Sequence, residues 1–141
     1  MTDNFNLERF IDAQNPVFDE VTQELENGEK ESHWMWFIFP QIHSLGYSST
    51  SKFYAIKSLE EANAYLAHPI LGARLEQCCK ILMDLQDIPA LDIFEEIDEQ
   101  KLLSSMTLFA SINGDKTLFQ AVLNKYFNGE KHEETLTLLD A

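Results

Sequence analysis

Residues 32–41 read Ser-His-Trp-Met-Trp-Phe-Ile-Phe-Pro-Gln, and the run 34–39 within them is continuously large and apolar. Such a run cannot lie in water without exposing a large hydrophobic patch. We therefore expect residues 34–39 to form the centre of the core, as a short helix that Ser32 caps and Pro40 ends. A buried strand is the alternative, because a short run that is apolar on all sides fits both structures.

On both sides of this Trp-rich segment, residues 32–41, apolar residues recur at helical spacing and predict further helices. Two helices precede it. The first ends near Asn15, and the second begins at Pro16, which suits the first position of a helix. The serine-rich residues 41–51 predict a loop. The remaining helices are predicted at residues 58–67, 69–85, 91–94, 98–110 and 115–128, with a last helical turn after residue 131.

Capping residues mark several of these helix ends. Ser58 and Glu61 have the spacing of a capping box, and Asp98 and Asp115 are each suited to cap the start of a helix. Asn-Gly pairs that follow a helical pattern are typical of helix ends, and here they occur at residues 27–28, 113–114 and 128–129. These signals predict an all-α, multihelical single domain of about seven helices over residues 1–141.

The composition excludes several classes of partner. The chain carries 24 acidic and 10 basic residues, a net charge of −14. Its arginines are Arg9 and Arg74 and its lysines are scattered, whereas binding to duplex nucleic acid or to an anionic membrane surface needs clustered basic residues. The longest apolar run is too short to span a bilayer. Because the polar start also lacks the features of a signal peptide, we expect a cytoplasmic protein without nucleic-acid or membrane partners.

The two cysteines, Cys78 and Cys79, are adjacent in the chain. Neighbouring side chains on a helix point about 100° apart, which is a poor geometry for a mutual disulfide. We therefore expect two free thiols, of which one or both are buried.

Polar residues at the ends of the Trp-rich segment are the strongest candidates for a functional site. They are placed to line a pocket whose walls are the aromatic side chains. His33 is the candidate for acid–base catalysis, because an imidazole titrates near neutral pH. Lys101 and Ser104 share one helix face further along the chain. The predicted ligand-binding residues are Ser32, Trp36, Gln41, Tyr54, Lys101 and Ser104.

We expect neither a metal nor a cofactor. The histidine spacings HxH, HxxxH and HExxH are absent from the sequence, and so are the glycine-rich phosphate loops GxGxxG and GxxxxGK[ST]. The acidic residues between 84 and 99 lack EF-hand spacing and are typical of a solvated surface.

Several stretches of the sequence are distinctive. They are SHWMWFIFPQ at residues 32–41, SSMTLF at residues 104–109, NLERF at residues 6–10, YAI at residues 54–56, and shorter matches between residues 61 and 75. Together they resemble a bacterial family of uncharacterised proteins, DUF1810. The resemblance implies a multihelical single domain. The family has no established activity, so the resemblance assigns no role to any residue.

Three functions are compatible with these observations. The first is a binding or regulatory module with a polar-rimmed aromatic pocket for a small molecule. The second is a hydrolase for a nucleotide-like or sugar-like substrate, with His33 as acid or base and with Gln41, Tyr54 and Lys101 binding the substrate. The third is an interaction or oligomerisation module whose apolar face meets a partner helix. The sequence does not fix the oligomeric state.

Overall fold

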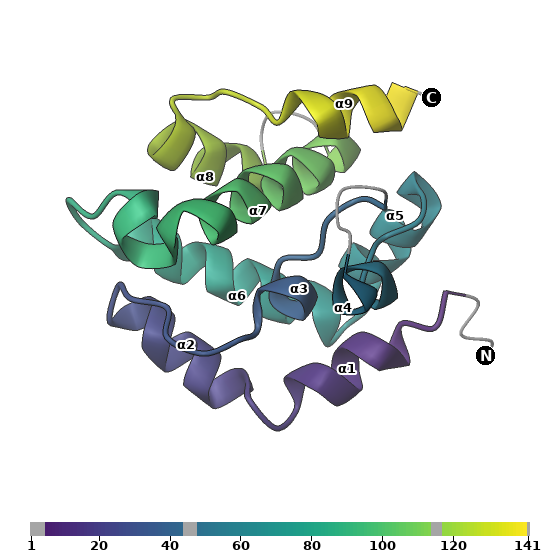
Figure 1. Ribbon diagram of the computed structural model, residues 1–141, viewed down its shortest axis with the longest axis horizontal. Coiled ribbons are helices and arrows are strands. Elements are labelled where there is room, and N and C mark those ends of the chain that lie inside the picture. The colour runs from purple at the N-terminus through teal and green to yellow at the C-terminus, as the bar shows by residue number, and fades with distance from the viewer. Residues whose placement is uncertain (1–4, 44–47, 114–116, 141) are drawn as a thin grey trace.

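In the computed structural model, which describes residues 5–43, 48–113 and 117–140, the regular structure is helical throughout (Figure 1). The predicted all-α, single-domain class is confirmed, although the described residues form nine helices rather than about seven. Their one β-type pairing is an isolated bridge between Ile42 and Ile56. The helices are α1 (Glu8–Gln14), α2 (Phe18–Glu26), α3 (Met35–Ile38), α4 (Ser49–Phe53), α5 (Leu59–Ala67), α6 (Leu71–Asp84), α7 (Ala90–Asn113), α8 (Leu118–Phe127) and α9 (Glu133–Asp140).

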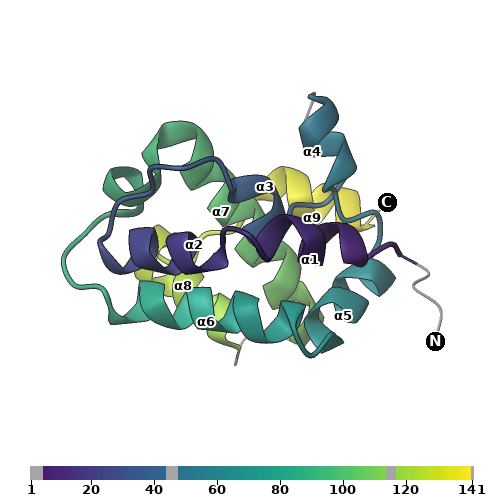
Figure 2. The same cartoon turned by 90° about the horizontal axis from the view of Figure 1, so that it is seen from below.

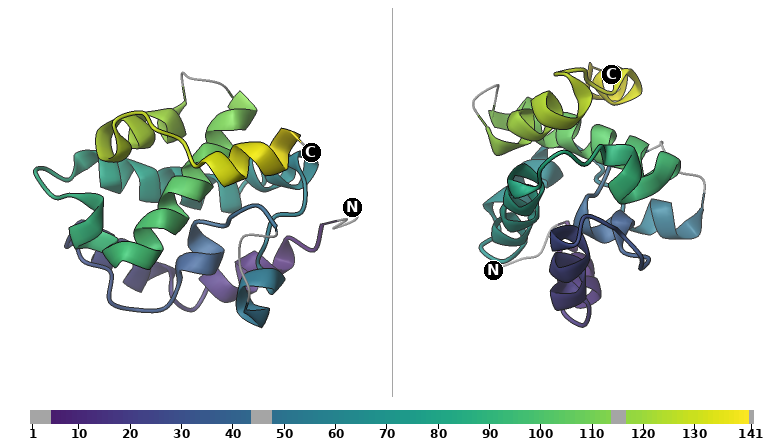
Figure 3. Two further views of the ribbon diagram at one scale, coloured as in Figure 1. Left: turned by 45° about the horizontal axis from the view of Figure 1, so that its top comes forward. Right: turned by 90° about the vertical axis from the view of Figure 1, so that its left-hand side faces the viewer.

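The second half of α7 is the central element of the domain. Every residue from 104 to 110 is buried, because α5, α8 and α9 all pack against α7. In Figure 1, α8 and α9 lie above α7, α6 lies below it, α5 lies to its right, and α1 and α2 form the lowest layer. Figure 2 views this layer from below and shows α2 running beside α6, with which it packs. In both views of Figure 3, α4 projects from the side of the domain away from α8.

The Trp-rich segment lies in the core, as predicted. Trp34 is only 1% exposed, and its ring packs against those of Phe39 and Phe94 at centroid distances of 6.3 and 6.5 Å. Trp36 is half-buried. Within the segment, residues 35–38 form helix α3 rather than a strand, so the segment adds a single short helical turn to the core.

Ser32 does not cap α3, which corrects one prediction. The helix begins after Trp34, at Met35. The hydroxyl of Ser32 instead donates a hydrogen bond of 2.6 Å to the buried carboxylate of Glu24 in α2. A hydrogen bond to a charged acceptor is stronger than one to a neutral group, so the carboxylate determines where the serine points.

The predicted helices at residues 91–94 and 98–110 are joined in α7. They meet at Glu95, whose backbone is not helical, with φ 66° and ψ 173°. Asp98 therefore lies in the first turn of the second helical part of α7, shortly after the kink. Its carboxylate contacts the ammonium groups of Lys30 at 2.9 Å and Lys101 at 3.6 Å.

Most of the predicted helix ends are confirmed, with local differences. The hydroxyl of Ser58 accepts the backbone N–H of Glu61 at 3.1 Å and caps α5. Gly28 and Asn128 have left-handed backbones, with φ 71° and 58°, at the ends of α2 and α8. The start of α8 is capped by Thr117. The predicted cap Asp115 lies outside the described residues, and so does Gly114 of the predicted pair at 113–114.

Two short helices differ from the prediction. Helix α4 was not predicted; it begins inside the predicted loop, where the hydroxyl of Ser48 accepts the N–H of Ser51 at 3.0 Å. The predicted last turn is the eight-residue helix α9. Both helices are too short to show a clear apolar period, so their caps and their packing determine them.

Both cysteines are free thiols and are buried in α6, as predicted. Among the described residues, no helix has the length and apolar character that crossing a membrane requires.

Candidate functional site

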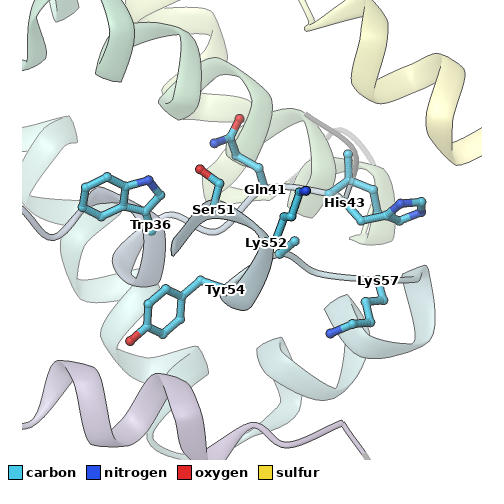
Figure 4. A pocket seen from close by; sticks show the side chains of 9 residues that line it. Trp36, Gln41, His43, Ser51, Lys52, Tyr54 and Lys57 are labelled. Carbon is cyan, nitrogen blue, oxygen red and sulfur yellow. The ribbon is translucent and has the colours of Figure 1, made fainter. Parts of the chain in front are cut away.

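A cleft of about 230 Å³ opens between α3, α4 and the chain that follows each of them (Figure 4). Side chains of several chemical types line it, from an indole to two lysines. In Figure 4 the indole nitrogen of Trp36 lies on the side of its ring that faces Ser51 and Gln41, and the Lys52 side chain extends between Gln41 and His43. The lining residues are Trp36, Gln41, Ile42, His43, Ser51, Lys52, Tyr54, Ala55 and Lys57.

The isolated β-bridge brings the two halves of the cleft together. The N–H of Ile56 donates to the carbonyl of Gln41, and the N–H of His43 donates to the carbonyl of Ile56, both at 2.8 Å. These bonds hold the chain after α3 beside the chain after α4. The polar side chains of residues 41–43 and 51–57 therefore face a common space.

A buried arginine fixes the position of α4. Arg9 in α1 donates from Nε to the carbonyl of Phe53 at 2.8 Å and from Nη2 to the carbonyl of Ala55 at 3.0 Å. Its guanidinium also pairs with the Glu61 carboxylate at 2.6 Å, and both side chains are almost fully buried. A buried charge is stable only with such complete pairing, so this ion pair holds the rear wall of the cleft in place.

Aromatic contacts form the floor of the cleft. The ring of Tyr54 packs against Phe37 at a centroid distance of 5.4 Å and against Phe10 at 5.9 Å. The ammonium group of Lys101 lies 4.9 Å from the centre of the Trp36 ring, a cation–π contact. Lys101, a predicted ligand-binding residue, therefore touches the Trp36 ring from α7 but does not itself line the cleft.

The cleft is basic although the protein is strongly acidic. Lys52 and Lys57 line it, and no carboxylate of residues 5–43, 48–113 or 117–140 does. Within the described part of the chain, neither ammonium group has an ion-pair partner. The indole N–H of Trp36 adds a further hydrogen-bond donor. The lining is therefore rich in donors and positive charge.

A second hollow, of about 430 Å³, adjoins the cleft on the other side of α4. Lys52 and Lys57 line this second hollow as well as the cleft, so these two lysines separate the two spaces. Among the residues that the structure describes, no carboxylate lines the second hollow either. Its lining residues are Asn6, Arg9, Ser49, Lys52, Phe53 and Lys57.

Three of the predicted ligand-binding residues, Trp36, Gln41 and Tyr54, line the cleft together. His33, the predicted catalytic residue, lines a third hollow with Lys30 and the kinked part of α7. Trp36 is the one predicted residue that borders both spaces. The structure therefore separates the imidazole of His33 from Gln41 and Tyr54, with which it was grouped.

Ser32 and Ser104 do not line the cleft, and their grouping with it is corrected. Ser32 is bound to Glu24. Ser104 is fully buried in α7, where its hydroxyl is 2.9 Å from that of Thr135 in α9. The hydroxyl of Ser32 joins the loop before α3 to α2, and that of Ser104 joins α7 to α9. Spacing along the chain cannot reveal either role.

Four further residues of the lining were not predicted from the sequence, namely His43, Ser51, Lys52 and Lys57. A signal for them exists, because residues 32–59 contain no aspartate or glutamate in a chain that has 24. That gap in the acidic residues covers the Trp-rich segment and both walls of the cleft. The described residues hold no cluster of three or more His, Cys, Asp or Glu side chains suited to a metal ion.

Comparison with known proteins gives the chain a family but no activity. A family model described as "protein of unknown function (DUF1810)" matches residues 4–139. The crystal structure of the conserved hypothetical protein Rv1873 from Mycobacterium tuberculosis is similar over 99% of each chain, with 45% sequence identity and a TM-score of 0.96. Among curated proteins, none matches. The chain belongs to the DUF1810 family of proteins of unknown function.

Proposed function

We propose that the protein is a binding module for a small, negatively charged molecule, which occupies the cleft between α3 and α4. One observation supports this proposal above the others. In the described part of the chain, Lys52 and Lys57 have no ion-pair partner and line a space that no carboxylate lines, although the protein has a net charge of −14. A lining of one sign raises the local concentration of ligands of the opposite sign.

The size and the walls of the cleft support a small ligand. Its volume of about 230 Å³ lies below the range of roughly 300–1,000 Å³ that is typical of pockets for drug-sized molecules. Donors from Lys52, Lys57 and the Trp36 indole suit the oxygens of a phosphate, sulfate or carboxylate group. The amide of Gln41 adds a group that both donates and accepts, and so suits a hydroxyl.

The position of His33 favours binding over hydrolysis. The hydrolase hypothesis places His33 beside Gln41 and Tyr54, but His33 lines a different hollow from these two residues. General acid–base catalysis needs the imidazole within hydrogen-bond reach of the substrate. Binding needs only the groups that already line the cleft.

Titration calorimetry with ribose 5-phosphate, and with ribose as the uncharged control, tests the proposal. We expect the wild-type protein to bind ribose 5-phosphate and not ribose. The double variant Lys52→Gln/Lys57→Gln should bind at least about tenfold more weakly, because each ammonium–oxyanion hydrogen bond is worth more than a neutral one. Lys80→Gln, which removes an exposed lysine on α6, is the matched control and should bind as the wild type does.

Two outcomes would contradict the proposal. One is the absence of any binding of the phosphate compound at low ionic strength, where attraction between charges is strongest. The other is equal weakening in the double variant and in Lys80→Gln, which would indicate a general effect of net charge and not a site.

A further inference from the structure

The second hollow contains an exposed aromatic ring that the core does not use. Phe53, the last residue of α4, is 52% exposed. The ring of Tyr54 meets it nearly at right angles, at a centroid distance of 4.8 Å. The backbone carbonyl of Phe53 is held by Arg9 at 2.8 Å. Phe53 is therefore anchored through its backbone and its neighbour while more than half of its surface faces solvent.

The cationic groups beside Phe53 differ in whether their hydrogen-bond donors are already engaged within the protein. The guanidinium of Arg9 is already saturated by carbonyl oxygens and by Glu61, and Arg9 is only 5% exposed. Lys52 and Lys57 have no ion-pair partner among the described residues, and both line the cleft as well as the second hollow. An anionic group on these lysines would therefore border both spaces.

We propose that the molecule bound here is a nucleoside monophosphate, with its phosphate on Lys52 and Lys57 and its base stacked on Phe53. This inference rests on the proposed function and specifies the ligand class. Every nucleobase offers a flat aromatic face, and stacking on an aromatic side chain is the general means by which proteins hold bases. A sugar phosphate would satisfy the lysines and leave Phe53 exposed to water.

The negative charge of the protein limits how many phosphate groups the ligand can carry. A nucleic-acid polymer needs an extended basic track along its phosphates. Here the basic lining is confined to the neighbourhood of α4, and the chain as a whole carries a charge of −14. The repulsion grows with each added phosphate, so the site favours a single nucleotide over a polynucleotide.

Calorimetry with adenosine 5′-monophosphate, ribose 5-phosphate and adenosine separates the contributions of base and phosphate. We expect the nucleotide to bind about tenfold more tightly than ribose 5-phosphate, as one stacked base predicts. Phe53→Leu, which keeps apolar bulk but removes the ring, should abolish this difference, and Phe53→Tyr should retain it. Leu91→Ala, at an exposed apolar residue of α7, is the control and should change neither affinity.

The outcomes show separately whether the proposed ligand class is wrong and whether the proposed anion site is wrong. If ribose 5-phosphate binds as tightly as the nucleotide, or if the advantage of the nucleotide survives Phe53→Leu, the placement of the base is wrong while the anion site stands. If adenosine binds as tightly as the nucleotide, the role of the lysines is wrong. If neither phosphate compound binds in a way that depends on Lys52 and Lys57, the proposed function is wrong as well.

Discussion

At the scale of single residues, the carboxylate of Glu24 in α2 holds the loop before α3 in place. Its carboxylate accepts the backbone N–H groups of Glu31 and Ser32, the hydroxyl of Ser32, and the indole N–H of Trp34, at distances between 2.6 and 2.9 Å. Burial by itself raises the pKa of this carboxyl, but the hydrogen bonds, those of Ser32 foremost, lower the pKa from 4.5 to about 2. The position of Trp34 thus depends on a charged residue of α2.

This shift predicts acid sensitivity that can be assigned to one residue. Because the folded state lowers the pKa of Glu24, its contribution to stability is present above pH 4.5 and is lost as the pH falls from 4.5 towards 2. The full shift corresponds to about 3 kcal/mol. Glu24→Gln should lower the free energy of unfolding at pH 7 by about 2–3 kcal/mol. Between pH 5 and pH 3 the stability of this variant should fall less than that of the wild type, as measured by urea unfolding.

Glu26→Gln, at an exposed carboxylate on the same helix, is the control for the change in net charge. If Glu24→Gln has the stability of the control at pH 7, the carboxylate does not organise the loop before α3.

At the scale of elements, the corner between α5 and α6 needs a glycine for reasons of space. A Cβ at position 72 would lie 2.1 Å from the backbone carbonyl oxygen of Leu66. The corner is tight because the N–H of Gly72 donates to the carbonyl of His68 at 2.9 Å. Backbone atoms cannot move aside as a flexible side chain can, so the close approach of the two helices depends on the missing methyl group.

Gly72→Ala should therefore destabilise the protein by about 1–3 kcal/mol, as overpacking generally does, even though alanine favours helices. Chemical denaturation checks the magnitude. Ala73→Ser, at the exposed next residue, should cost much less. An alanine variant as stable as the wild type would indicate that α5 and α6 can move apart freely.

At the scale of the whole molecule, the two thiols report on how tightly the domain is packed. Cys78 and Cys79 face the interior from α6, and the sulfur of Cys79 is 3.7 Å from that of Met106 in α7. Burial raises the pKa of Cys78 to about 12, against a smaller opposing effect of Arg74, and burial also raises the pKa of Cys79. Neither thiol is therefore ionised near neutral pH in the folded protein.

A thiol reagent should accordingly react with neither cysteine at pH 8 in the native protein and with both in concentrated urea, because the thiolate is the reactive form. The rate of absorbance change on adding an aromatic disulfide measures this directly. Rapid reaction of one thiol under native conditions would mean that α6 separates from α7 far more often than the buried packing implies.

The sequence determined the helical class, most helix ends and the burial of the Trp-rich segment. These features depend on local properties, namely apolar periodicity, capping residues such as Ser58, and the cost of exposing residues 34–39 to water. The sequence also placed Trp36, Gln41 and Tyr54 among the candidate site residues, and the structure brings these three to one cleft.

Only the tertiary structure decided which polar side chains remain available to a ligand. Ser32 and Ser104 are bound to partners on other helices, whereas Lys52 and Lys57 have no ion-pair partner among the described residues. Hydrogen bonds and ion pairs form between groups that are distant in the chain, as between Arg9 and Glu61, so no local pattern records them. The physical reason is that helix formation is a short-range property, while the pairing of buried polar groups is settled only when the helices pack.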